Sequence, residues 1–160
     1  MSGDDTPDIT AATHRALAVQ LFNRTWELLE SPRSPADDRA MLASAIASRL
    51  HWTGIGTEEN YAAGDWLVSH VASHLGYCDV ALDFAASAYE TAQAAAPPVP
   101  SWLLASTQEG MARAHACAGH AEERDRFAAA ARDTLDTVDD TEDRDLIAGQ
   151  LASIPGLIDA

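Results

Sequence analysis

Lysine is absent from this chain of 160 residues, whose ten basic side chains, all arginine, are outnumbered by 25 acidic ones. The formal net charge of −15 argues against the basic patch that a nucleic-acid backbone or an anionic membrane surface requires. No stretch approaches the roughly 18 apolar residues of a membrane span, and the acidic N-terminus lacks the apolar core of a signal peptide. We therefore expect a cytoplasmic protein with no nucleic-acid or membrane partner.

Cysteine is nearly as scarce, since Cys78 and Cys117 are the only two. Two thiols in a chain of this size indicate a reducing compartment and not a disulfide framework. The sequence also lacks a Gly-rich phosphate loop, a paired-carboxylate signature and a recognisable nucleophile motif, so no cofactor is expected. The acidic run over residues 133–145 lacks the central glycine and the ligand order of a calcium loop, and we interpret it as a solvated linker.

No segment alternates polar and apolar residues for long with the period of a β-strand, whereas apolar residues recur at helical spacing throughout. The pattern predicts an all-α chain of about seven helices. They cover approximately residues 10–30, 35–52, 57–75, 77–96, 101–118, 120–137 and 144–154. Ser34 followed by Pro35 is a strong helix start, and Ser101 is a second expected N-cap. Residues 1–9 are expected to be disordered, and residues 10–160 to form one domain.

A helix–turn–helix pattern recurs after 43 positions, from Gly76 to Gly119. The same shift pairs Phe84 with Phe127, and several alanines also match. These hairpins resemble tetratricopeptide (TPR) repeats, which have a glycine at the turn and small residues seven before it and twelve after it. The corresponding pairs are Ser69 with Ala112, and Ala88 with Ala131. Arg124 departs from the family's alanine five after the turn, and Asp65 and Gln108 depart from its aromatic residue eleven before it.

A second resemblance covers most of the chain from about Thr25 onward. The run over residues 26–29, His51-Trp52 and the segment over residues 64–67 are similar to a group of small bacterial TPR-like proteins. Both resemblances imply a TPR-like stack of antiparallel helical hairpins, and neither implies a particular activity. In such stacks the first helix of each hairpin lines a concave groove.

Applied to this chain, that geometry predicts a groove between the third and fifth helices. Trp66, His70, Ser73 and His74 lie on the side of the third helix opposite its apolar seam, and Glu109 and Arg113 lie on the matching face of the fifth. An indole, two imidazoles, a carboxylate and a guanidinium suit a peptide, a protein segment or a polar small molecule. The simpler interpretation is a solvated surface on which Glu109 and Arg113 form an ordinary i,i+4 pair. A binding module is the predicted function.

The alternative function is a small pathway enzyme or a metal-dependent protein that uses His70, His74 and Glu109 on the same surface. His70 and His74 stand four residues apart, which lets two imidazoles reach one metal ion. A third ligand would have to come from Glu109, Cys117 or His51. Because two histidines at this spacing are common without a metal, no metal is the preferred expectation.

Two further histidines and the apolar residues of the C-terminus have structural explanations. His115 falls in the seam of the fifth helix, where we expect a hydrogen-bonded core residue, and His51 lies at a helix C-terminus, where a cation is favourable. At the C-terminus, Ile154, Leu157 and Ile158 are expected to cap the stack, with a homodimer contact as the alternative.

Overall fold

The computed structural model describes residues 9–157, and the predicted disorder at residues 1–8 and the predicted capping role of Ile158 lie outside that range. The described residues form seven helices and no strand, so the all-α prediction is confirmed. The helices are α1 (Ala11–Leu29), α2 (Pro35–Trp52), α3 (Glu58–His74), α4 (Cys78–Ala94), α5 (Ser101–Cys117), α6 (Ala121–Leu135) and α7 (Thr141–Ala152).

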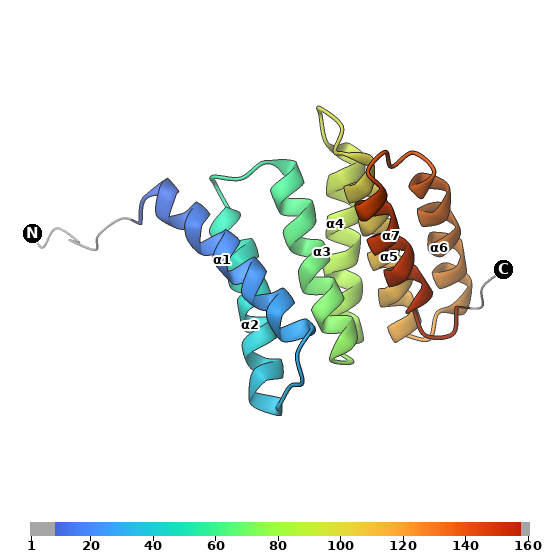
Figure 1. Ribbon diagram of the computed structural model, residues 1–160, viewed down its shortest axis with the longest axis horizontal. Helices are drawn as coiled ribbons and strands as arrows, with labels where there is room; N and C mark the ends of the chain where they lie inside the picture. Colours follow the sequence, from blue (N-terminus) through green and yellow to red (C-terminus); the bar gives the residue numbers. More distant parts are fainter. Residues whose placement is uncertain (1–8, 158–160) are drawn as a thin grey trace, which may run out of the picture.

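Consecutive helices pair as antiparallel hairpins, α1 with α2, α3 with α4, and α5 with α6, and these hairpins lie side by side (Figure 1). The odd-numbered helices all run toward the lower edge of that view, so their C-terminal ends gather at one side of the molecule. The last helix, α7, packs on α5 and α6. The further assignment of this stack to the TPR type stays a prediction.

The helix starts and turns follow from local chemistry. At α2, the Ser34 N–H donates to a carboxylate oxygen of Asp37 at 2.9 Å, and the Asp37 N–H donates to Ser34 Oγ at 3.3 Å, which completes a capping box. Gly76 and Gly119 both have φ of +77°, a conformation that a side chain disfavours, and each ends a helix in the same hydrogen-bonded turn. The prediction that Ser101 is an N-cap is wrong. It is the first residue of α5, and its hydroxyl donates to the Thr137 carbonyl at 3.1 Å.

The central helix α3 is covered on more than one side, because it packs against α2, α4 and α5. Its residues from Gly64 to Ala72 are all buried. Small residues on α3 let the neighbouring helices approach closely. Ser69, for example, donates to the Ala81 carbonyl of α4 at 2.9 Å. A Cβ on Gly64 would lie 2.6 Å from Arg49 Cδ of α2, and one on Gly110 of α5 would lie 2.8 Å from Trp66 Cδ1. The middle of the stack is therefore solid.

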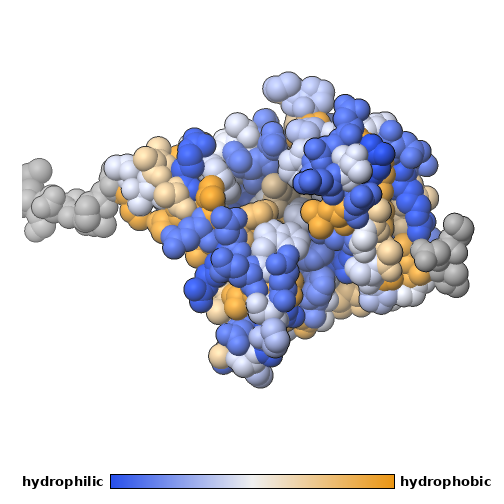
Figure 2. Space-filling model, viewed as in Figure 1, coloured by the Kyte–Doolittle hydropathy of each residue, from blue (hydrophilic) through white to orange (hydrophobic). Residues whose placement is uncertain are grey.

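The C-terminal segment closes the stack as predicted. Ile154 is 2% exposed, and Leu157 packs against the same apolar cluster, which is built from α5, α6 and α7. The face seen in Figure 2 is mostly hydrophilic, with hydrophobic side chains scattered among the polar ones. Within residues 9–157, no helix combines the length and the apolar character needed to cross a bilayer.

Candidate functional site

The four α3 side chains predicted to line an open groove are divided between the interior and the surface. Trp66 is 6% exposed and His70 is 5% exposed, whereas Ser73 is half-buried and His74 is exposed. The prediction that Trp66 and His70 face a groove is wrong. The reason is Trp26 of α1, whose ring lies 5.9 Å from the Trp66 ring and 5.7 Å from the His70 ring, and so covers both.

From the opposite side, α5 closes the same space with a carboxylate. Glu109 is fully buried, and one of its oxygens accepts from Arg113 Nε at 2.7 Å. Its other oxygen accepts from Trp66 Nε1 at 3.4 Å. The pair Glu109–Arg113, expected either in a groove or on a solvated surface, is thus an interior ion pair. A charge in the interior persists only when it is paired and hydrogen-bonded. Glu109 and Arg113 meet this condition because each is the ionic partner of the other.

Arg113 also fastens the last helix to the stack. Its Nη2 donates to the Gln150 carbonyl at 2.7 Å and to Ser153 Oγ at 2.8 Å. Together, Trp66, Glu109, Arg113 and Ser153 form a continuous chain of hydrogen bonds from α3 through α5 to the end of α7, which we call the Glu109 network. No local pattern connects Ser153 with Arg113, since they are 40 residues apart.

His70 borders this network without joining it by a hydrogen bond. Its Nδ1 is 4.0 Å from Glu109 Oε2 and is a buried atom without a hydrogen-bond partner among the described residues. Burial, followed by the positive charges of Arg113 and His74, holds the pKa of His70 well below its ordinary value of 6.5. His70 is therefore neutral near pH 7, and its proximity to Glu109 is not an ion pair.

Each of the three residues considered as a third metal ligand beside His70 and His74 has another partner in the structure. Glu109 is engaged by Arg113, Cys117 is in a disulfide, and His51 Nδ1 lies 2.8 Å from His14 Nδ1. Across residues 9–157, no group of three or more His, Cys, Asp or Glu side chains is arranged to hold a metal ion.

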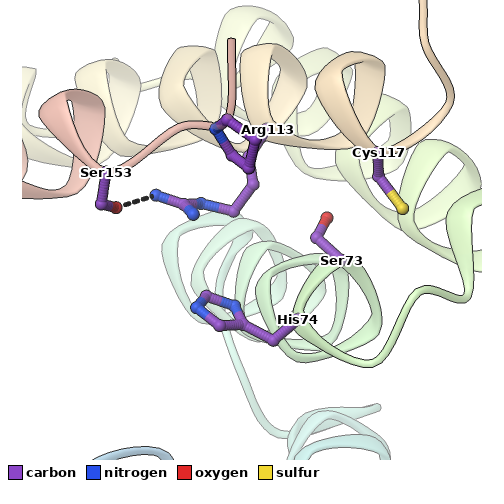
Figure 3. Close-up of a pocket in the computed structure, with 6 residues that line it drawn as sticks. Ser73, His74, Arg113, Cys117 and Ser153 are labelled. Atoms are coloured by element: carbon purple, nitrogen blue, oxygen red, sulfur yellow. Dashed lines mark hydrogen bonds between the residues drawn. The ribbon is translucent and has the colours of Figure 1, made fainter. Parts of the chain in front are cut away.

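A pocket of about 290 Å³ lies where the C-terminal ends of α3, α5 and α7 meet (Figure 3). Its lining comprises Ser73, His74, Arg113, Cys117, Ser153 and Pro155. Three predicted site residues, Ser73, His74 and Arg113, are therefore brought together, while Trp66, His70 and Glu109 lie behind them in the interior. Ser153 and Pro155 were not predicted as site residues. No sequence signal marked them, because the burial that makes the Arg113 guanidinium require oxygen acceptors beyond Glu109 follows from packing.

The polar atoms of this pocket are arranged for a ligand that both donates and accepts hydrogen bonds. His74 Nδ1 is 2.9 Å from the His70 carbonyl, which can only accept, so Nδ1 carries the proton and Nε2 of the neutral ring is an acceptor. Burial lowers the pKa of His74 below its ordinary value, although its bond to the His70 carbonyl opposes that shift. Ser73 Oγ is buried and has no hydrogen-bond partner among the described residues. The Arg113 guanidinium supplies donors on the α5 side.

The cysteines differ from expectation. Cys78 and Cys117, predicted to be free thiols, form a disulfide whose Cα atoms are 5.4 Å apart. The short turn at Gly76 places the start of α4 beside the end of α5, and this proximity between consecutive hairpins is not visible in a spacing of 39 residues.

Comparison of the chain with protein-family models, with curated protein sequences and with solved structures finds no match.

Proposed function

We propose that the protein is a binding module that holds a polar small molecule, or the end of a peptide, in the pocket at the ends of α3, α5 and α7. The observation that supports this most directly is the convergence of Ser73, His74 and Arg113, polar side chains from two helices, on one pocket.

The ligand class follows from the charges around the pocket. Arg113 offers donors to a carboxylate or a carbonyl, although Glu109 already balances its charge. His74 Nε2 and the converging helix C-termini, which carry partial negative charge, favour a donor such as an amine. An amino acid or a short peptide carries both groups, and a volume of about 290 Å³ lies at the small end of ligand pockets. A cytoplasmic location belongs to the same proposal.

The enzyme alternative receives less support from this geometry. Of its three residues, only His74 lines the pocket, because His70 and Glu109 are buried behind it.

A thermal-shift screen tests the proposal, with amino acids and dipeptides compared against simple amines and simple carboxylates. A ligand at about 100 times its Kd stabilises by roughly 2.7 kcal/mol, which raises Tm by about 5–10 °C in a domain of this size. Ser73→Leu fills the pocket and should abolish the shift, whereas Ala129→Leu, on the exposed side of α6, should retain it. Equal shifts in the two variants would place the ligand elsewhere and contradict the proposal.

A further inference from the structure

The disulfide lies at the wall of the pocket, and only one of its two cysteines lines the pocket. Cys117 lines the pocket together with Ser73 and Arg113, whereas Cys78 does not (Figure 3). Both cysteines are partly exposed. A small molecule inside the pocket therefore approaches the bridge from the side of Cys117.

The two sulfurs also stand at opposite ends of helices. Cys78 is the first residue of α4, and no side chain caps the free N–H groups of that first turn. The positive end of the helix dipole favours a thiolate there, although the neighbouring Asp79 opposes this in part. Cys117 is the last residue of α5, where the dipole disfavours negative charge. When the bond breaks, Cys78 is consequently the better leaving group.

The contact between these hairpins does not consist of the bridge alone. Directly beside it, Ala72, Ala81, Ala85 and Ala114 form a buried cluster that joins α3, α4 and α5. We expect this packing to persist when the disulfide opens, so that the two sulfurs remain close enough to rejoin.

From these observations we infer that the Cys78–Cys117 bridge is a thiol-exchange site, at which a low-molecular-weight thiol enters the pocket and attacks Cys117. The thiolate of the small molecule forms a bond to Cys117 Sγ, the bond between the two cysteines breaks, and its electron pair remains on Cys78 Sγ. A second thiolate then attacks the small-molecule sulfur of the mixed disulfide and releases Cys117. The protein gains two electrons, and two small thiols become one small disulfide.

This inference uses the pocket only as an access route and does not depend on the ligand proposed above. In a reducing compartment, disulfides in proteins are mostly transient, catalytic or redox-sensing. The exchange would give this protein a covalent link between its second and third hairpins that responds to the thiol pool.

The test treats the oxidised protein with reduced glutathione, quenches by acid at short times, alkylates the free thiols and maps both peptides by mass spectrometry. We expect the glutathione adduct on Cys117 to exceed that on Cys78 by about tenfold, because access and leaving-group stability act in the same direction. Helical circular dichroism should be unchanged by full reduction, and reoxidation should restore the bridge.

Two variants complete the design. Ser73→Leu should slow adduct formation several-fold, and Ala129→Leu should not, once circular dichroism has shown that both variants are folded. An adduct found mainly on Cys78, an equal rate in the two variants, or a bridge that is reduced only after unfolding in urea would overturn the inference. Because glutathione reactivity is measured without any amino-acid ligand, failure here and failure of the binding proposal are distinguishable.

Discussion

Replacing Glu109 by glutamine removes the charge of the carboxylate while it preserves the shape of the side chain. Glu109 is 0% exposed, and Arg113, its ionic partner, is 5% exposed, so water screens neither charge. In Glu109→Gln the guanidinium retains its bonds to the end of α7 but loses the negative charge that compensates it.

Removing one partner of a buried ion pair costs about 3–5 kcal/mol. The amide oxygen of glutamine still accepts from Arg113 Nε, so we expect the lower end, about 3 kcal/mol. That is a large part of the roughly 5–15 kcal/mol by which small domains are stable. With a urea m-value of about 1–3 kcal/mol per M, the unfolding midpoint should fall by about 1–3 M.

Urea unfolding followed by tryptophan fluorescence measures this change, and the indole of Trp66, which donates to Glu109, lies next to the substitution. Glu90→Gln, the same change at an exposed position of α4, should alter stability by less than about 0.5 kcal/mol. Arg113→Met alone should also be costly, and the double variant should cost clearly less than the sum. A loss below about 1 kcal/mol in Glu109→Gln would show that water reaches the Arg113 charge, and would refute the network as described.

Two other predictions concern His70 and a glycine contact. Because the pKa of His70 is lowered in the folded state, acid protonates it in the unfolded chain first, so stability should fall by up to about 1.4 kcal/mol per pH unit below about 6.5. His70→Gln should reduce that slope in urea unfolding measured at several pH values. An unchanged slope in His70→Gln would show that His70 is solvated. Gly110→Ala forces a Cβ against Trp66, and overpacking of about 1–3 kcal/mol outweighs a helix gain of up to about 1 kcal/mol. Gly149→Ala, which meets no atom within 4 Å, should instead raise Tm, and equal effects at the two glycines would contradict the close packing.

The helices were predictable because their signals are local. The N-cap Ser34, the proline at the start of α2 and the turn glycines Gly76 and Gly119 each specify a backbone conformation from a few neighbouring residues. All four signals correspond to the structure. Ser101 misled, because its hydroxyl bonds to a distant carbonyl. The interpretation of residues 133–145 as a linker was also wrong in part, because both ends of this run are helical, in α6 and α7.

Whether the candidate site residues are buried or exposed depends on long-range packing, which the sequence of a single helix does not reveal. Trp66 and His70 do lie opposite the apolar seam of α3, but a helix in the middle of a stack buries both sides. One clue was present in the sequence: between Asp65 and His74, α3 has no side chain of Arg, Glu or Lys, and a helix with so few charges is usually covered all round. The position of Trp26 above these rings had no comparable signal.

The disulfide was missed for a different reason. Two cysteines say nothing of their separation in space, and compartment statistics favoured free thiols. Knowledge that Gly76 and Gly119 are equivalent turns was enough to place Cys78 just after one turn and Cys117 just before the other, but not to show that these turns lie at the same end of adjacent hairpins.

The close packing at the centre of the stack determines which positions tolerate amino-acid substitutions. A side chain in the middle of α3 contacts neighbours on several sides, so replacing it disturbs more than one helix at once. At the C-terminal ends of α3 and α7, His74 and Ser153 are exposed, and different side chains there would give the pocket a different chemistry with little effect on the packing of the helices. Under the proposed function, a change of ligand would therefore require substitutions at these ends and none in the middle of the stack.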